Sequence, residues 1–157
     1  MLTGKQFEAI GRLTLGFNEL ETVLDTCLPY ILQNPEWSVC LLMADKGHRF
    51  SDKIERFIKV LKAILEERPI AESRIKSVTS LLAKAKHIAT KRNEYVHSVA
   101  YIDFRVNKRM IRNKKGTTTI DENEILQLAE EAGYIAMHLS QECENLRSLL
   151  MTLRTSG

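Results

Sequence analysis

The sequence predicts a mainly α-helical fold, an antiparallel helical bundle of four to five helices with a short β-hairpin before the last helix. Apolar residues recur at helical spacing along most of the chain, which indicates amphipathic helices packed around one core. The pattern is interrupted at about residues 99–113, where β-branched and aromatic residues precede a turn dipeptide. The chain has 157 residues and no internal repeat or low-complexity linker, so we expect one domain spanning residues 1–157.

The N-terminal part of the chain predicts two helices. Thr3 and Gln6 form a capping box, in which each side chain satisfies a backbone N–H group of the other residue. The apolar stripe that follows is Phe7, Ile10, Leu13, Phe17, Leu20, Leu24 and Leu28. Pro29 should kink or end this helix near residues 30–33, because proline lacks a backbone N–H. A shorter helix should start at Pro35 and stop near Gly47.

The middle of the chain predicts two further helices, separated by Pro69. The third helix should begin at Ser51, with Asp52 as its capping residue. Its apolar stripe is Ile54, Phe57, Ile58, Leu61 and Leu65. The fourth helix should run from Ile70 to about His97. Its apolar stripe is Ile75, Val78, Leu81, Leu82, Ala85 and Ile88.

The hairpin and the last helix follow Ser98. Residues 99–106 predict a strand, Asn107 and Lys108 a turn, and residues 109–112 a second strand. Asp121 then starts the last helix, which should run almost to the C-terminus. Its apolar residues are Ile125, Leu126, Ala129, Ile135, Leu139, Leu146 and Leu150.

The composition is that of an ordinary globular protein, with 44% hydrophobic and 27% charged residues. The longest apolar runs are far too short to cross a membrane. The N-terminal residues lack the charged and apolar regions of a secretion signal. We therefore expect a cytoplasmic protein with no membrane association.

The cysteines and histidines do not predict a metal site. Three cysteines, at Cys27, Cys40 and Cys143, are far apart in the sequence, odd in number and without a CxxC pair, so we interpret them as reduced packing residues. Three of the four histidines lack partners at metal-ligand spacing and are expected at the surface or in packing roles: His48, His87 and His138.

The formal net charge of +3 is unevenly distributed. Residues 105–115 carry six cations and no acid: Arg105, Lys108, Arg109, Arg112, Lys114 and Lys115. After Gly116 the balance reverses, and acidic residues dominate. The basic segment could attract nucleic acid, pair with the acidic helix of a partner subunit, or form a solvated hairpin.

The most informative stretch lies at the end of the fourth predicted helix and reads Arg92-Asn93-Glu94-Tyr95-Val96-His97. It combines a permanently charged guanidinium with a side chain that exchanges a proton near pH 7. This pairing suits chemistry on a phosphodiester. The alternative is structural, because arginine and histidine near a helix C-terminus also satisfy the last carbonyls and the helix dipole.

With this motif after the long helices and before the hairpin, the chain resembles the HEPN superfamily. That family is an all-α bundle whose signature is an arginine, usually followed by a polar residue, four to six residues before a histidine. Two further segments resemble small bacterial HEPN-like proteins: residues 17–21 on the first helix and residues 50–54 at the start of the third. The sequence departs from many relatives at Ser98, where they have glycine.

The resemblance implies a metal-independent endoribonuclease that acts as a homodimer, needs no cofactor and cuts RNA in a cleft shared by two subunits. Members of the family occur as toxins of toxin–antitoxin pairs, in defence and in RNA processing. Others have lost catalysis. The alternative function is therefore a non-catalytic module that binds RNA, a nucleotide or a protein partner, such as a cognate antitoxin or regulatory protein.

In such a nuclease the catalytic residues would be Arg92, Asn93 and His97. His97 could transfer a proton to or from the 2′-hydroxyl or the leaving 5′-oxygen, Arg92 could bind the non-bridging oxygens, and Asn93 could orient His97 or hold the phosphate. A five-residue step turns an ideal helix by about 140°. Either the reach of the arginine and a fraying last turn close this gap, or the partner subunit supplies one of the two groups. We expect the second arrangement.

Further RNA contacts are expected from residues near the motif and from the basic segment. Glu94 could pair with a cation in the cleft, and Tyr95 could stack on a base or pack into the core. Glu21 and Lys53 could reach the cleft, or could have ordinary first-turn or i,i+4 charge roles. From the basic segment we include Arg105, Lys108, Arg109 and Arg112.

Overall fold

The computed structural model describes residues 3–32, 49–96, 99–103, 108–113, 116–119 and 121–155. The helices in these ranges are α1 (Gly4–Leu32), α3 (Phe50–Glu67), the 3-10 helix η1 (Pro69–Ala71), α4 (Glu72–Val96) and α5 (Glu122–Thr155). The strands are β1 (Val99–Asp103), β2 (Lys108–Asn113) and β3 (Gly116–Thr119). The prediction of a mainly helical bundle is confirmed. The predicted short helix between Pro35 and Gly47 lies outside the described residues.

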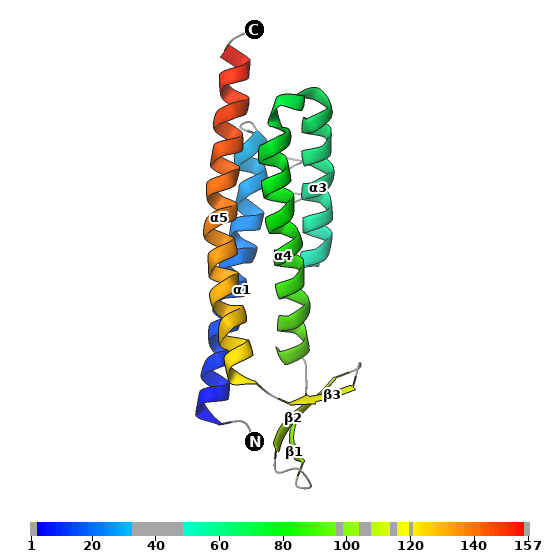
Figure 1. Cartoon of the computed structure of the whole chain (residues 1–157), viewed down its shortest axis with the longest axis vertical. Coiled ribbons are helices and arrows are strands. Elements are labelled where there is room, and N and C mark those ends of the chain that lie inside the picture. The colour runs from blue at the N-terminus through cyan, green and yellow to red at the C-terminus, as the bar shows by residue number, and fades with distance from the viewer. Residues whose placement is uncertain are drawn as a thin grey trace.

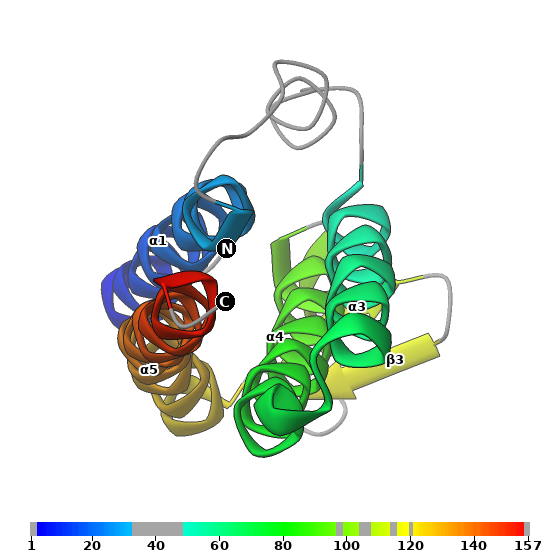
Figure 2. The same ribbon diagram turned by 90° about the horizontal axis from the view of Figure 1, so that it is seen from above.

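The helices form two layers, with α1 beside α5 and α3 beside α4 (Figures 1 and 2). The core lies between the layers and contains most of the predicted apolar stripes, including Leu13, Phe57 and Leu82, which are fully buried. Phe7 was predicted to face the core and is instead 59% exposed. Gln6 and Ala9 take the inward positions of this turn. Because successive helical residues are about 100° apart, Phe7 then faces outward.

The predicted antiparallel arrangement is wrong for α1 and α5, which run in the same direction (Figure 1). Near the start of both helices, Thr3 Oγ1 donates to Glu122 Oε1 at 3.3 Å. Near their ends, the Arg147 guanidinium lies 4.2 Å from the centre of the Tyr30 ring. Start meets start and end meets end, so α1 and α5 are parallel.

The direction of α4 explains this arrangement. Lys91 of α4 pairs with Glu124 near the start of α5, whereas Arg74 at the other end of α4 pairs with Glu142. These contacts make α4 antiparallel to α5. On the other side of the bundle, Phe17 of α1 contacts Phe50 at the start of α3, and α1 and α3 run in the same direction. In the described bundle, α4 is therefore the helix that opposes the other three.

Glycine allows α1 and α5 to approach closely at Gly16. A Cβ atom on Gly16 would lie 3.0 Å from the Ala129 carbonyl oxygen and 3.4 Å from Ala132 Cβ. We expect Gly16→Ala to lower the free energy of unfolding by about 1 kcal/mol, because the cost of overpacking against backbone exceeds the gain in helix propensity. Gly133→Ala is the matched control, since a Cβ there meets nothing within 4 Å. Gly133→Ala should raise the free energy of unfolding by about 0.5–1 kcal/mol. Denaturant titration of the wild type and both variants measures the two changes. Equal effects of the two changes would contradict the close packing at Gly16.

The helix starts agree with two of the three predicted caps. The Thr3 N–H donates to Gln6 Oε1 at 3.0 Å and the Gln6 N–H donates to Thr3 Oγ1 at 3.1 Å, as a capping box requires. Asp121 Oδ1 caps α5 by accepting from the N–H of Asn123 and of Glu124. The prediction for Asp52 is wrong. The capping position of α3 is Arg49, which makes no side-chain cap hydrogen bond. The helix starts earlier than predicted because the N–H groups of Asp52 and Lys53 already donate to the Arg49 carbonyl.

The three strands form one antiparallel sheet in the order β1-β2-β3, beyond the end of the helices where α4 stops and α5 begins (Figure 1). Val99 pairs with Arg112 and Asp103 with Lys108. Lys108 therefore begins β2, although the sequence placed it in a turn, and residues 104–107 lie outside the described part of the chain. Strand β3 was not predicted, because its glycine and three threonines show no apolar alternation.

Cys27 of α1 and Cys143 of α5 are free and buried, as predicted for packing residues. Contact with the Cys27 thiol, together with burial, raises the pKa of Cys143. Cys40 lies outside the described residues. Among the described helices, none has both the length and the apolar character needed to cross a membrane.

Candidate functional site

Arg92 lies at the point where α1, α3 and α4 meet. Its guanidinium carbon is 5.1 Å from the centre of the Phe17 ring of α1. The Phe17 ring in turn contacts Phe50 of α3, with ring centres 4.7 Å apart. Arg92 Nη1 donates to Asn93 Oδ1 at 3.1 Å, whereas the buried Nε has no hydrogen-bond partner among the described residues. Packing on an aromatic face thus holds the guanidinium and leaves part of its donor capacity unused.

Arg92 and Asn93 line a pocket of about 470 Å³ between α1, α3 and α4, which we call the Arg92 pocket. Its volume is within the range of small-molecule sites, about 300–1,000 Å³. The lining residues are Phe17, Glu21, Arg49, Phe50, Ser51, Lys86, Ala89, Thr90, Arg92 and Asn93. The structure therefore brings together three predicted site residues, Arg92, Asn93 and Glu21.

The Arg92 pocket favours an anion. Three cations line it, Arg49, Lys86 and Arg92, against the single carboxylate of Glu21. The nearest ion pair of Lys86 is with Glu55 at 3.3 Å, and both side chains are more than half exposed, so water screens this contact. The capping residue of α3 supplies no side-chain acceptor for the N–H groups of the first turn, which leaves them available to an anion. Asp52 in the same turn offsets part of the helix dipole.

Lys53 does not line the pocket but lies behind Glu21. It is only 5% exposed, and its Nζ lies 2.8 Å and 2.9 Å from the two oxygens of Asp25 and 3.3 Å from Glu21 Oε1. Burial alone would lower the pKa of Lys53, but the hydrogen bonds and charges of Asp25 and Glu21 outweigh it and raise the pKa above its ordinary value. Lys53 is therefore charged, and it fixes the position of Glu21.

Glu94 and Tyr95 belong to the contact between α4 and α5 and do not line the Arg92 pocket. Tyr95 is buried. Burial, followed by a hydrogen bond to Glu124, raises the pKa of its phenol. Glu94 lies 4.0 Å from Lys91, which also pairs with Glu124 at 3.2 Å. Of the two roles considered for Tyr95, the structure favours packing over stacking on a base.

The remaining predicted residues are only partly described. His97 follows Val96, the last residue of α4, and lies outside the described residues, as does Arg105. Lys108, Arg109 and Arg112 are in β2, where the side chains are outside the described part of the chain.

Sequence reasoning missed three residues of this region: Arg49, Lys86 and Asp25. Two of them carried a usable signal. Lys86 lies seven residues before Asn93, a spacing that places both on one face of α4. Asp25 lies four residues after Glu21, so two carboxylates share one face of α1 and indicate a cation between them. Arg49 directly precedes residues 50–54, the segment that resembles HEPN-like proteins, but no local pattern indicated that Arg49 itself belongs to the site.

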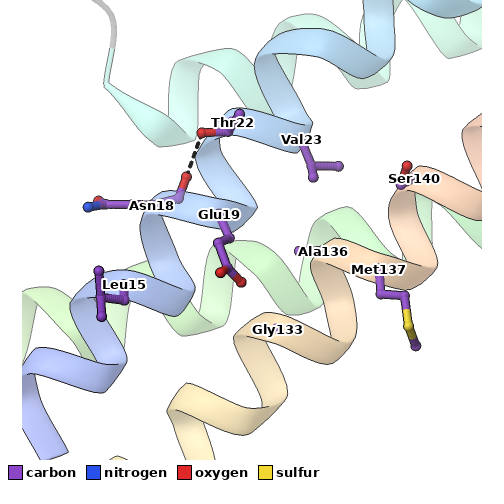
Figure 3. Close-up of a pocket in the computed structure, with 9 residues that line it drawn as sticks. All are labelled: Leu15, Asn18, Glu19, Thr22, Val23, Gly133, Ala136, Met137 and Ser140. Atoms are coloured by element: carbon purple, nitrogen blue, oxygen red, sulfur yellow. Dashed lines mark hydrogen bonds between the residues drawn. The ribbon is translucent and has the colours of Figure 1, made fainter.

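A second hollow lies on the outer side of the bundle, between α1 and α5 (Figure 3). It has a volume of about 570 Å³, larger than the Arg92 pocket. The lining is mainly apolar or neutral: Leu15, Asn18, Glu19, Thr22, Val23, Gly133, Ala136, Met137 and Ser140. Glu19 supplies its one charge, and no residue of the Arg92 motif reaches it. Its lining offers no group suited to catalysis on a phosphodiester.

Comparison with known protein families, with curated proteins and with solved structures finds no match to this chain. Within the described residues, no group of three or more histidine, cysteine, aspartate or glutamate side chains is placed to hold a metal ion. The chemistry of the Arg92 pocket is that of an anion site with a forked donor, an amide and one carboxylate.

Proposed function

We propose that the protein is a metal-independent endoribonuclease of the HEPN type, which acts as a homodimer and cuts RNA by attack of the 2′-hydroxyl. One observation carries this proposal: the Arg92 pocket combines the two motif residues Arg92 and Asn93 with two further cations and the uncapped start of α3. Together these groups suit a phosphodiester, which carries negative charge and accepts several hydrogen bonds.

RNA supplies its own nucleophile in this mechanism. The 2′-oxygen bonds to the adjacent phosphorus as its proton leaves, and the bond from phosphorus to the 5′-oxygen breaks as that oxygen takes a proton. The products are a 2′,3′-cyclic phosphate and a 5′-hydroxyl. Arg92 stabilises the charge on the non-bridging oxygens. His97 transfers a proton, a role that typically contributes about 10²–10⁴-fold to the rate.

The spacing of the motif in the sequence favours a site built from two subunits. Arg92 faces the pocket from within α4, and His97 comes directly after the last residue of that helix. A five-residue step rotates a side chain by about 140° around an ideal helix. In the proposed dimer, Arg92 of one protomer and His97 of the other therefore form each site. In this proposal His97 acts as the acid or the base of the proton transfer.

The second candidate function is binding without cleavage. It is favoured by the internal contacts of Arg92, which already stacks on Phe17 and donates to Asn93. In that case the pocket would hold RNA or a nucleotide, and β2 with its basic residues would extend the contact along the backbone. A protein partner such as an antitoxin could regulate either activity.

The decisive experiment is incubation of the pure protein with labelled single-stranded RNA and tRNA in EDTA. The proposal requires cleavage that leaves 2′,3′-cyclic phosphate ends. The same RNA with 2′-O-methyl groups should stay intact, because the nucleophile is blocked. Intact unmodified RNA at micromolar protein would refute the nuclease. Binding without cleavage, with affinity that falls steeply as salt is raised, would favour the second function.

A further inference from the structure

Glu21 is a carboxylate in a pocket whose other charged groups are all cations. It repels a phosphate bound by Arg49, Lys86 and Arg92, and so weakens the anion site. A carboxylate accepts hydrogen bonds and donates none. Its position in the pocket therefore suits a second part of the ligand, one that presents N–H or O–H donors.

Asp25 and Lys53 keep Glu21 available for such a contact. Lys53 Nζ lies 2.8 Å and 2.9 Å from the two Asp25 oxygens, closer than the 3.3 Å to Glu21 Oε1. Asp25 is thus the closer partner of Lys53, and Glu21 is the carboxylate on the pocket side. The Glu21 side chain is 37% exposed, so a ligand in the pocket can reach it. Among the described residues, Glu21 contacts Lys53 through Oε1, so Oε2 can accept from a ligand donor.

We propose that Glu21 recognises the guanine base of a nucleotide bound in the Arg92 pocket. Guanine carries two adjacent donors on its Watson–Crick edge, the N1–H and the 2-amino group, and these match the two oxygens of a carboxylate. Adenine, cytosine and uracil each place an acceptor next to a single donor on that edge, and the carboxylate repels this acceptor. The proposal rests on the proposed function for its ligand class, RNA.

The rest of the pocket suits a single unstacked nucleotide. Sequence-specific proteins bind single-stranded RNA by stacking a base on an aromatic side chain and hydrogen-bonding its edge. Phe50 is only partly buried and lines the pocket together with Glu21. The three cations then hold the phosphate of the same nucleotide. The group that recognises the base thus comes from α1 and the stacking surface from α3. The cations that hold the phosphate come from α4 and from Arg49, directly before α3.

Calorimetric titration of the wild-type protein with the 3′-monophosphates of guanosine, adenosine, cytidine and uridine tests this inference. We expect guanosine 3′-monophosphate to bind about tenfold or more tightly than the other three, as for other bidentate base contacts. Inosine 3′-monophosphate, which lacks the 2-amino group, should fall between guanosine and adenosine. Glu21→Gln should abolish the preference by lowering the affinity for guanosine 3′-monophosphate. It should raise the affinity for adenosine 3′-monophosphate, because the phosphate contacts remain and the repulsion from the carboxylate is gone.

Glu19→Gln is the matched control, since Glu19 lies on the same helix and lines the other hollow (Figure 3). It should leave the guanine preference unchanged. The inference is overturned if the wild type binds none of the four nucleotides or binds them equally. It is also overturned if the preference survives Glu21→Gln, or if that change removes all nucleotide binding, which would mark a structural role. RNA cleavage without guanine preference refutes only the inference, whereas guanine preference without cleavage refutes only the nuclease.

Discussion

Arg92→Ala is expected to lower kcat/KM for RNA cleavage by about 100- to 1,000-fold, the usual cost of removing a donor that stabilises charge in the transition state. The guanidinium lies in the pocket between α1, α3 and α4, where its Nε has no partner among the described residues. Arg92→Lys should recover little activity, because an ammonium cannot donate two parallel hydrogen bonds to a phosphate. Initial rates on a labelled oligonucleotide in EDTA measure the effect.

Arg74→Ala is the control for this variant. Arg74 is on the same helix, is 47% exposed and pairs with Glu142 at 3.3 Å, far from the Arg92 pocket. We expect its cleavage rate to equal that of the wild type. An equal loss of activity in both variants would mean that α4 had been disturbed in general and would remove the support for Arg92.

Mixing two inactive variants tests the shared site. If each site takes Arg92 from one protomer and His97 from the other, a dimer of one Arg92→Ala and one His97→Ala chain keeps one complete site. After random exchange half of the dimers are mixed, so the mixture should regain about a quarter of the wild-type rate. No recovery, with dimers still present by light scattering, would place both residues in one protomer.

The helices of this fold could be predicted from the sequence, but their directions could not. A periodic apolar stripe identifies the buried face of a helix without identifying the helix that covers it. The small residues at Gly16, Ala129 and Ala132 fit the close parallel contact of α1 and α5, yet the same residues would suit an antiparallel contact. The prediction that Phe7 faces the core was wrong for a local reason, because Gln6 of the capping box takes the inward position.

Only part of the site could be predicted from the sequence: Arg92, Asn93 and Glu21. Arg92 and Asn93 were found because they belong to one short motif. Arg49 directly precedes α3 and meets Arg92 only through tertiary packing. Lys86 is on α4 with Arg92 and was missed although its spacing to Asn93 carried a signal. Lys53 was expected either to reach the cleft or to have an ordinary charge role on its own helix. Its burial depends on two acceptors of another helix, Glu21 and Asp25, which no pattern around residue 53 could reveal.

Lys53→Met is expected to lower the free energy of unfolding by about 2–3 kcal/mol, although methionine keeps most of the apolar packing of the stem. The loss is electrostatic, because Asp25 and Glu21 would face each other without a cation. Removal of one partner from a fully buried pair costs about 3–5 kcal/mol, and the smaller value follows from the partial exposure of both carboxylates. Urea titration of wild type, Lys53→Met, Asp25→Asn and the double variant measures the coupling directly.

The burial of the ion pair, and not the distance between its charged atoms, should determine how much stability is lost when its cation is removed. Arg12 and Glu8 form an ion pair with the same 2.8 Å separation as Lys53 and Asp25, but both side chains are more than 60% exposed. Arg12→Met should therefore cost at most about 1 kcal/mol, as for other surface pairs. Equal losses in the Lys53 and Arg12 variants would contradict a buried ion cluster.

The pH dependence provides an independent check of the same cluster. Because the folded-state pKa of Lys53 is raised above 10.5, its stabilising contribution is complete below pH 10.5 and is lost as the pH rises through the folded-state pKa. The stability difference between wild type and Lys53→Met should thus be constant at neutral pH and shrink in strongly alkaline solution. A difference that stays constant through that range would show that the lysine acts through packing of its stem and not through its charge, and Glu21 would then lack the fixed cation that holds it in the pocket.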